Sequence, residues 1–462
     1  MDYFEFLEQK TTKVAQCGFE VDPADLCEAM FPHQVDAVRF LLRVGRGSAF
    51  LDTGLGKTLV QLEWARQVSR FAAGRVLILS PLAVAKQTEA EAIRFGIEGV
   101  EATRDPMAST AQIVVTNYER LHQVDPEMFV GVVLDESSIL KSFMGKTKRS
   151  LVDAFASTQF RLCCTATPAP NDHIELGNHS EFLGVMPGYE MLSRFFVNDT
   201  MDMGKWRLKR HAVVPFWDWV CSWAICVSKP EDLGHDGSLY DLPELHLERH
   251  VVDVESVSDR GDKLFRIPDM SATAMHRERR ISAPDRAAEV ARIVDAEPDE
   301  SWLIWVDTDY EADELRRAIP YASEVRGGDR PDVKEERLLG FSSGAIRVLI
   351  AKPKIAGFGL NWQHCARVVF CGLGYSYESF YQAVRRTWRF GQTREVRVHV
   401  VIGANELSAW NIVSAKRDGH DEMRRQMIDA THRSHGRRRE VKHPYNPTQP
   451  TALPSWIKEV RA

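Results

Sequence analysis

Residues 50–58 combine glycine, lysine and threonine in a spacing that suits phosphate binding. Gly54 and Gly56 let the backbone bend tightly and turn its N–H groups toward a phosphate, and a helix that opens at Lys57 adds the positive end of its dipole. In such a loop Lys57 meets the β- and γ-phosphates of a nucleotide, and Thr58 holds Mg²⁺. The usual pattern has a glycine where this chain has leucine, so a glycine-rich turn with a surface lysine is the plain alternative.

Two adjacent acids, Asp135 and Glu136, follow the apolar run at 132–134. Asp135 could bind Mg²⁺ through water, and Glu136 could accept a proton from the water that attacks the γ-phosphate. An acidic pair can also begin a helix, where the dipole favours negative charge. Its position directly after an apolar strand favours the site. The hydroxyl-rich turn at 165–168 could hydrogen-bond this pair, or could simply end a strand.

Gln382, Arg386 and Arg389 are spaced at i, i+4 and i+7 on a helix predicted from Ser379 to Gly391. Burying three polar groups on one stripe of a helix costs free energy unless they meet an anion or solvent. If the stripe faces the phosphate loop, Arg386 and Arg389 would neutralise charge that develops on the γ-phosphoryl group. A basic surface helix with no link to a nucleotide is the alternative.

Gln34 precedes the phosphate loop and carries an amide that could read the edge of an adenine as both donor and acceptor. Taken alone this residue is weak evidence. It gains meaning only together with the loop that follows.

Strands alternate with helices in two series, and this pattern favours parallel sheets whose ligand crevice lies at the carboxyl ends of the strands. In the first series the predicted strands cover residues 49–51, 75–81, 113–119, 132–134 and 160–164. In the second series they cover residues 302–306, 347–351 and 368–370. The loops that follow these strands are therefore the candidate binding surfaces.

Composition describes an ordinary globular chain of 462 residues, with 44% hydrophobic and 27% charged residues. The amino terminus is acidic, and the longest aromatic-apolar stretch, 213–227, is too short to span a bilayer, so we expect a cytoplasmic protein without a membrane partner. The eight cysteines lack zinc spacing and are expected to be reduced core thiols. Because the net charge is -6, any nucleic-acid binding must come from local basic patches, and two candidates lie at 205–210 and 432–442. A solvated charged face explains either patch equally well.

The predicted organisation has five parts. Residues 171–228 are expected to be helical and rich in tryptophan, with core packing or a helix pair at a domain interface favoured over base stacking. The polar, breaker-rich stretch at 229–238 is the best linker. The parts are an accessory segment at 1–30, a first domain at 31–228, the linker, a second domain at 239–402 and a helical, basic tail at 403–462 that could be a DNA arm or a protein tether.

The ordered set of motifs over residues 31 to 402 resembles the Swi/Snf-type branch of helicase superfamily two, and most of all its phage- or prophage-encoded members. Residues 50–58 resemble motif I, 116–119 motif Ib, 135–141 motif II and 165–168 motif III. Residues 357–361 resemble motif V, and 381–392 motif VI. Six motifs in this order are highly specific.

The resemblance implies an α/β fold of two tandem RecA-like domains with a helical insertion and a short tail, ATP and Mg²⁺ in the cleft between the domains, and nucleic acid across both. It implies ATP contacts by Gly54, Gly56 and Gln382 beside the residues named above. It also implies nucleic-acid contacts by Pro81, Thr116, Asn117 and Asn361.

The resemblance favours an ATPase that moves along double-stranded DNA without separating its strands. A strand-separating helicase on DNA or RNA stays open. So does an ATP-switched binding module that grips DNA and recruits a replication, recombination or nuclease partner.

Two residues depart from the family pattern. Ser138 stands where histidine is usual, which affects how motif II signals to motif VI. Arg385 stands where aspartate is usual, which reverses a charge beside Arg386. The chain also has little room for the insertions of chromatin remodelers, so nucleosome sliding is not implied.

Overall fold

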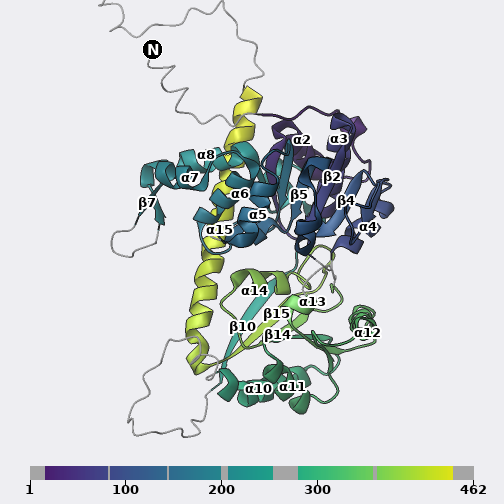
Figure 1. The fold of residues 1–462 in the computed structure, drawn as a ribbon. Helices are drawn as coiled ribbons and strands as arrows, with labels where there is room; N and C mark the ends of the chain where they lie inside the picture. The colour runs from purple at the N-terminus through teal and green to yellow at the C-terminus, as the bar shows by residue number, and fades with distance from the viewer. Residues whose placement is uncertain are drawn as a thin grey trace, which may run out of the picture.

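The chain forms two α/β domains, one above the other, and a long helix that runs beside both (Figure 1). The structure is a computed structural model, and it describes residues 16–81, 84–142, 145–198, 206–252, 279–356 and 362–440.

The first domain is built on a seven-stranded parallel sheet with the order β3-β4-β2-β5-β6-β1-β9. Apart from the half-buried edge strand β3, its strands are short, mostly apolar and buried on both faces, as expected when helices cover both sides of a parallel sheet. They are β1 (Arg46–Leu51), β2 (Arg75–Ser80), β3 (Val100–Ala102), β4 (Ile113–Asn117), β5 (Phe129–Asp135), β6 (Phe160–Cys164) and β9 (Ala224–Val227).

The edge strand β9 corrects the prediction of a helical segment over 171–228. Ala224 lies opposite Ser48 of β1, and the four residues of β9 are all buried in the sheet. A four-residue apolar run directly after a helix has no periodicity that separates it from the end of that helix. Pairing with β1, which lies far away in sequence, decides the outcome.

Helices cover both faces of the first sheet. One face carries α2 (Pro32–Val44), α3 (Lys57–Ala72) and α4 (Ala85–Arg94). The other carries α5 (Lys146–Ala154), α6 (Leu176–Leu183), α7 (Gly188–Phe195) and α8 (Val213–Trp223). A small antiparallel hairpin, β7 (Phe196–Asn198) and β8 (Trp206–Leu208), extends from α7. On α8, Trp217, Trp219 and Trp223 are buried, which confirms core packing over base stacking for these three side chains.

The second domain is built on a six-stranded parallel sheet with the order β10-β15-β14-β11-β13-β12. Its strands are β10 (Leu245–Val252), β11 (Trp302–Trp305), β12 (Ser323–Val325), β13 (Val348–Ala351), β14 (Arg367–Cys371) and β15 (Val396–Gly403). Helices α10 (Ala283–Ala296) and α11 (Asp309–Ala318) cover one face. The other face carries α12 (Pro331–Ser342), α13 (Pro353–Ala356) and α14 (Tyr377–Val384). The predicted class, two tandem α/β domains with parallel sheets, is confirmed.

The long helix α15 (Leu407–Glu440) leaves the second domain and returns to the first (Figure 1). Its Val413 is buried in the core of the second domain, whereas Met423 and Met427 are buried in the core of the first. Near its end Arg433 forms an ion pair with Asp218 of α8 at 2.9 Å. The described part of the predicted tail therefore ties the two domains together.

No helix in the described ranges is long and apolar enough to cross a membrane. Of the eight cysteines, six are buried, in agreement with the expected core thiols; Cys17 is exposed and Cys27 half-buried.

Candidate functional site

A cleft between the two domains collects most of the predicted site residues. The phosphate loop and the acidic pair contribute from the first domain, and the end of α14 with the turn after it contributes from the second. The predicted residues that line the cleft are Gly54, Gly56, Lys57, Thr58, Asp135, Glu136, Gln382, Arg386 and Arg389. The remaining lining comes from Thr53, Val84, Gln87, Glu91, Ala166 and Arg385.

The phosphate loop has the backbone that its glycines permit. Gly54 and Gly56 have φ values of 97° and 74°, in the left-handed region that favours glycine. Gly56 caps α3, so the amino end of that helix opens into the cleft beside Lys57. The Lys57 ammonium donates to the Leu51 carbonyl at 3.1 Å, which holds the side chain within the loop.

Gln34 is hydrogen-bonded to the phosphate loop. Its Oε1 accepts from the Phe31 N–H at 2.9 Å, and its Nε2 donates to the Leu55 carbonyl at 3.0 Å. A Cβ atom on Gly56 would lie 2.1 Å from Gln34 Nε2 and would displace the amide from the loop. Gln34 does not line the cleft. Adenine recognition by this amide stays a prediction.

The acidic pair stands at the carboxyl end of β5, beside Lys57. Burial, and then the charge of Glu136, raise the pKa of Asp135 to about 7. Glu136 has a φ of 53°, which is rare for a residue with a side chain and is typical of strained functional positions. Thr165 Oγ1 donates to Glu136 Oε2 at 3.5 Å, so the predicted contact between the hydroxyl-rich turn and the acidic pair is present.

The hydroxyl of Ser138 donates to the Glu136 carbonyl at 3.5 Å, so this hydrogen bond stays within the first domain. Instead, Lys141 at the end of the same segment pairs with Glu378 of α14 at 2.6 Å. The cross-domain contact of this motif is thus carried by the lysine three residues further along.

The predicted helix begins near Ser379 as expected but ends seven residues before Gly391. Helix α14 begins at Tyr377 and ends at Val384, and the following residues form turns. The backbone N–H groups of Thr387 and Trp388 both donate to the Val384 carbonyl, which also accepts from the Thr387 hydroxyl at 3.1 Å. A threonine hydroxyl that takes a backbone acceptor in this way competes with a regular helix.

Arg386 and Arg389 still reach the cleft, from turns rather than from a helical stripe. Burial lowers the pKa of Arg386 to about 10 and also lowers the pKa of Arg389, and the neighbouring Arg389 charge adds to the effect on Arg386. Both groups remain cationic at neutral pH. Two partly desolvated guanidinium groups in the same cleft as Lys57 make the cleft suited to a polyanion.

The phosphate loop is joined to the second domain by a cluster that we call the cleft node: Asp52, Tyr381, Arg385 and Arg424. Asp52 Oδ2 accepts from Arg385 at 2.7 Å and from Arg424 of α15, and its Oδ1 accepts from the Tyr381 hydroxyl. Burial by itself would raise the pKa of Asp52, but the charges of Arg385 and Arg424 lower it well below its ordinary range.

The cleft node explains Arg385, whose positive charge departed from the family pattern: its partner is the aspartate of the phosphate loop. Sequence reasoning missed this role, because Asp52 lies 333 residues from Arg385 and 372 from Arg424. Gln87 and Glu91 were also missed, although their i, i+4 spacing on α4 was a usable signal. Gln87 Nε2 donates to Glu91 Oε1 at 3.0 Å, and both side chains line the cleft.

The residues predicted to contact nucleic acid differ in how far they are buried. Pro81 is half-buried at the end of β2. Thr116 is buried, and its hydroxyl donates to the Thr103 carbonyl at 2.9 Å, so this side chain supports the sheet. Asn117 is also buried, at the end of β4. Asn361 and motif V at 357–361 lie outside the described residues.

Comparisons with known proteins match the second domain most directly. Residues 285–391 match the model of the helicase conserved C-terminal domain, and this segment contains both Arg386 and Arg389. No curated protein matches the chain in sequence. Among solved structures, the chain is similar to the SWI2/SNF2 ATPase core of Sulfolobus solfataricus in complex with double-stranded DNA. That comparison has 18% identity and a TM-score of 0.44, and it covers 89% of this chain and 99% of the other.

Proposed function

We propose that this chain is an ATP-dependent nucleic-acid motor, and specifically a translocase that couples ATP hydrolysis to movement along double-stranded DNA. One observation carries the proposal. A phosphate-binding loop and an acidic pair from one domain share a cleft with two arginines from the other. A nucleotide in that cleft would touch both domains, so its hydrolysis would change how they are held together.

The residues present fit ATP with Mg²⁺. Open backbone N–H groups at the start of α3 and the Lys57 ammonium suit the β- and γ-phosphates. Thr58 and Asp135 offer the oxygen ligands that Mg²⁺ prefers, and both line the cleft. When bound, the ion would neutralise charge between the β- and γ-oxygens.

The roles of the protein groups follow from their positions. Glu136 would orient the attacking water and accept its proton, and Thr165 steadies its carboxylate. Arg386 and Arg389 would stabilise the charge that develops on the γ-phosphoryl group. Because these arginines belong to the second domain, hydrolysis would require a closed cleft.

Movement on duplex DNA rests on the motif resemblance and on the match of residues 285–391 to a helicase C-terminal domain. The resemblance to phage- or prophage-encoded members stays a prediction, as do the nucleic-acid contacts and a replication, recombination or nuclease partner.

Steady-state ATP hydrolysis tests the proposal. We expect duplex DNA to stimulate the wild-type rate more than matched single-stranded DNA or RNA does. Lys57→Ala and Arg389→Ala should each lower the rate by about 10³-fold. Arg394→Ala is the matched control, because Arg394 lies close in sequence but pairs with Glu300 and does not line the cleft.

Other outcomes point elsewhere. Stimulation by single strands or RNA together with strand displacement would favour an unwinding helicase. Hydrolysis that no nucleic acid stimulates would contradict the motor and favour the ATP-switched binding module.

A further inference from the structure

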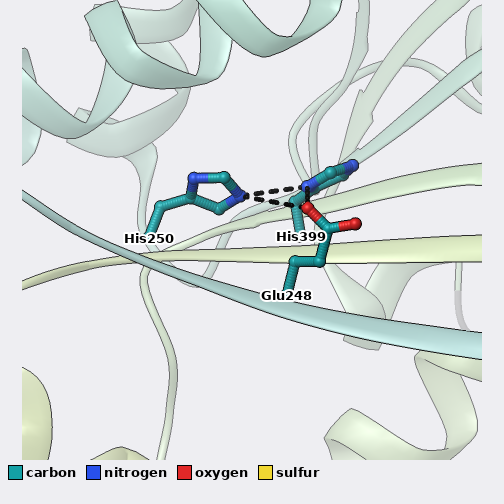
Figure 2. A group of neighbouring side chains, drawn as sticks. All are labelled: Glu248, His250 and His399. Carbon is teal, nitrogen blue, oxygen red and sulfur yellow. Dashed lines mark hydrogen bonds and ion pairs between the residues drawn. The ribbon is translucent and has the colours of Figure 1, made fainter.

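Imidazole and carboxylate side chains gather at one edge of the second sheet, and none of them lines the cleft. Strands β10 and β15 are parallel neighbours, with Glu248 of β10 opposite His399 of β15. Side chains alternate along a strand, so His250, two residues after Glu248, lies on the same face. Figure 2 shows the three side chains converging from the two strands.

The three ligand atoms are spaced as around a small metal ion. His250 Nε2 and His399 Nδ1 are 3.0 Å apart, and Glu248 Oε2 lies 3.4 Å from the His399 nitrogen and 4.0 Å from the His250 nitrogen. By triangle geometry, the nearest point equidistant from these atoms lies in their plane, about 2.1 Å from each, which is close to the bond length of Zn²⁺ to imidazole nitrogen or carboxylate oxygen.

A second carboxylate supports the arrangement from α10. Glu289 Oε1 lies 3.4 Å from Nδ1 of His250, and Glu289 is itself held by Arg292 at 2.6 and 2.8 Å. A carboxylate at one ring nitrogen keeps the proton there, which leaves the lone pair of Nε2 free to bind a metal. Carboxylates commonly hold zinc-bound histidines in this way.

We propose that Glu248, His250 and His399 form a binding site for a divalent transition-metal ion, with Zn²⁺ as the ion that fits best. Two imidazoles and one carboxylate suit Zn²⁺, with water in a fourth position, whereas Mg²⁺ and Ca²⁺ prefer all-oxygen sites. Glu248 is 47% exposed and leaves an entry path for the ion.

The site would fasten the edge of the second domain. Within the described sheet, β10 is bonded only to β15, and it is the strand that follows the predicted linker at 229–238. An ion held by both strands links them by more than backbone hydrogen bonds. Metal binding to a folded site then adds directly to the stability of that fold.

The affinity is expected to be micromolar rather than tighter. Metal at Nδ1 of His399 places the ring proton on Nε2, which is buried and has no hydrogen-bond partner among the described residues. Only one of the two histidines therefore has the outer carboxylate that strengthens such sites.

Calorimetric titration of the full, chelator-stripped chain with Zn²⁺, in excess Mg²⁺, tests the proposal. We expect one equivalent at micromolar affinity from this site, and a rise in Tm of about 5 °C at saturating Zn²⁺. Co²⁺ in its place should give visible absorption bands without thiolate charge transfer, which separates the site from the eight cysteines.

Variants locate the ion. His250→Asn and His399→Asn should no longer bind the one equivalent of Zn²⁺. Glu289→Gln should still bind it, with about tenfold weaker affinity. His246→Asn is the matched control: with Glu244 at 3.9 Å and Glu395 at 3.6 Å it belongs to a second histidine–carboxylate group on the same strand and face, so the change should leave the ion at Glu248, His250 and His399 in place.

Circular dichroism tests whether each variant is folded. If a histidine variant does not fold, Glu248→Gln takes its place, because the Glu248 side chain is half-exposed. Absence of binding by the wild type at 100 µM Zn²⁺, on the order of a hundred times the expected constant, would overturn the site. Retention of the equivalent in the folded ligand variants would overturn it too. Neither result bears on the proposed ATPase.

Discussion

Two buried ionic clusters have similar chemistry but lie in different parts of the molecule. The first, which we call the domain 2 cluster, consists of Arg279, Arg286, Glu311 and Glu406. Arg286 pairs with Glu311 at 2.9 Å with both side chains fully buried, and Arg279 pairs with Glu311 at 3.0 Å and with Glu406 at 3.1 Å. Its members come from α10, α11 and neighbouring segments of one domain. The second is the cleft node around Asp52.

The difference lies in what each cluster joins. The domain 2 cluster connects elements that stay packed together for as long as the domain is folded. The cleft node connects the phosphate loop, α14 and α15 across the two domains, and its Arg385 lines the cleft. A buried ion pair that loses one partner leaves an uncompensated charge, unless the structure opens and water reaches it. We therefore expect the first cluster to govern stability and the second to govern cleft closure.

The largest effect is expected from Glu311→Gln. The change removes one of the two carboxylates that the buried Arg286 and the partly buried Arg279 share and leaves Glu406 to face both positive charges, which should lower the free energy of unfolding by about 3–5 kcal/mol. Urea denaturation measures this loss. Hydrolysis of ATP, assayed where the variant is still folded, should stay near the wild-type rate. A loss under about 1 kcal/mol would contradict a structural role for this cluster.

Asp52→Asn should act mainly on turnover. Without the negative charge, Arg385 and Arg424 lose their shared counter-ion, and the closed cleft that presents Arg386 becomes less populated. We expect ATP hydrolysis to fall about 10- to 100-fold, equivalent to about 1.4–2.7 kcal/mol.

Urea denaturation of Asp52→Asn should show a smaller loss than that of Glu311→Gln, because the opened cleft lets water reach the arginines. Asp418→Asn on the exposed side of α15 is the control and should change neither quantity. Unchanged hydrolysis with a large loss of stability would show that the cleft node, like the domain 2 cluster, governs stability and not cleft closure.

Gly54→Ala tests the close approach of the two domains. Gly54 has a φ of 97°, and a Cβ atom there would lie 3.0 Å from the Cβ of Phe390 in the second domain. We expect about 1–2 kcal/mol of backbone strain and slower hydrolysis. Gly96→Ala is the matched control, because Gly96 has a φ of 66° and open space around it. If both variants hydrolyse ATP equally well, the contact with Phe390 does not matter for closure.

The smallest effect is expected at the exposed cross-domain pair of Lys141 and Glu378, 2.6 Å apart. A double-mutant cycle with Lys141→Ala and Glu378→Gln should give a coupling of about 0.2–1 kcal/mol in unfolding experiments at low salt. The coupling should fall by roughly half in 1 M salt, where the Debye length of about 3 Å is close to the separation of the two charges. A larger or salt-independent value would place this pair with the cleft node.

Much of the candidate site could be predicted because its chemistry is local. The glycines, Lys57 and Thr58 lie within five consecutive residues, and Asp135 ends a strand whose partners in a parallel sheet end at the same edge. Arg386 and Arg389 were assigned to the cleft for a partly wrong reason, since they lie on turns after Val384. Their closeness in sequence kept them together whichever local conformation they took.

The amino-acid sequence by itself determined the two α/β series and the residues of the phosphate loop, the acidic pair and the arginine pair, because short-range order and strand polarity are enough to place them. Only the tertiary structure decided that Ala224 to Val227 form a strand, that Asp52 meets Arg385, and that His250 meets His399 across 149 residues. Each of these contacts joins segments far apart in the chain, and no local periodicity records which distant partner a segment will meet.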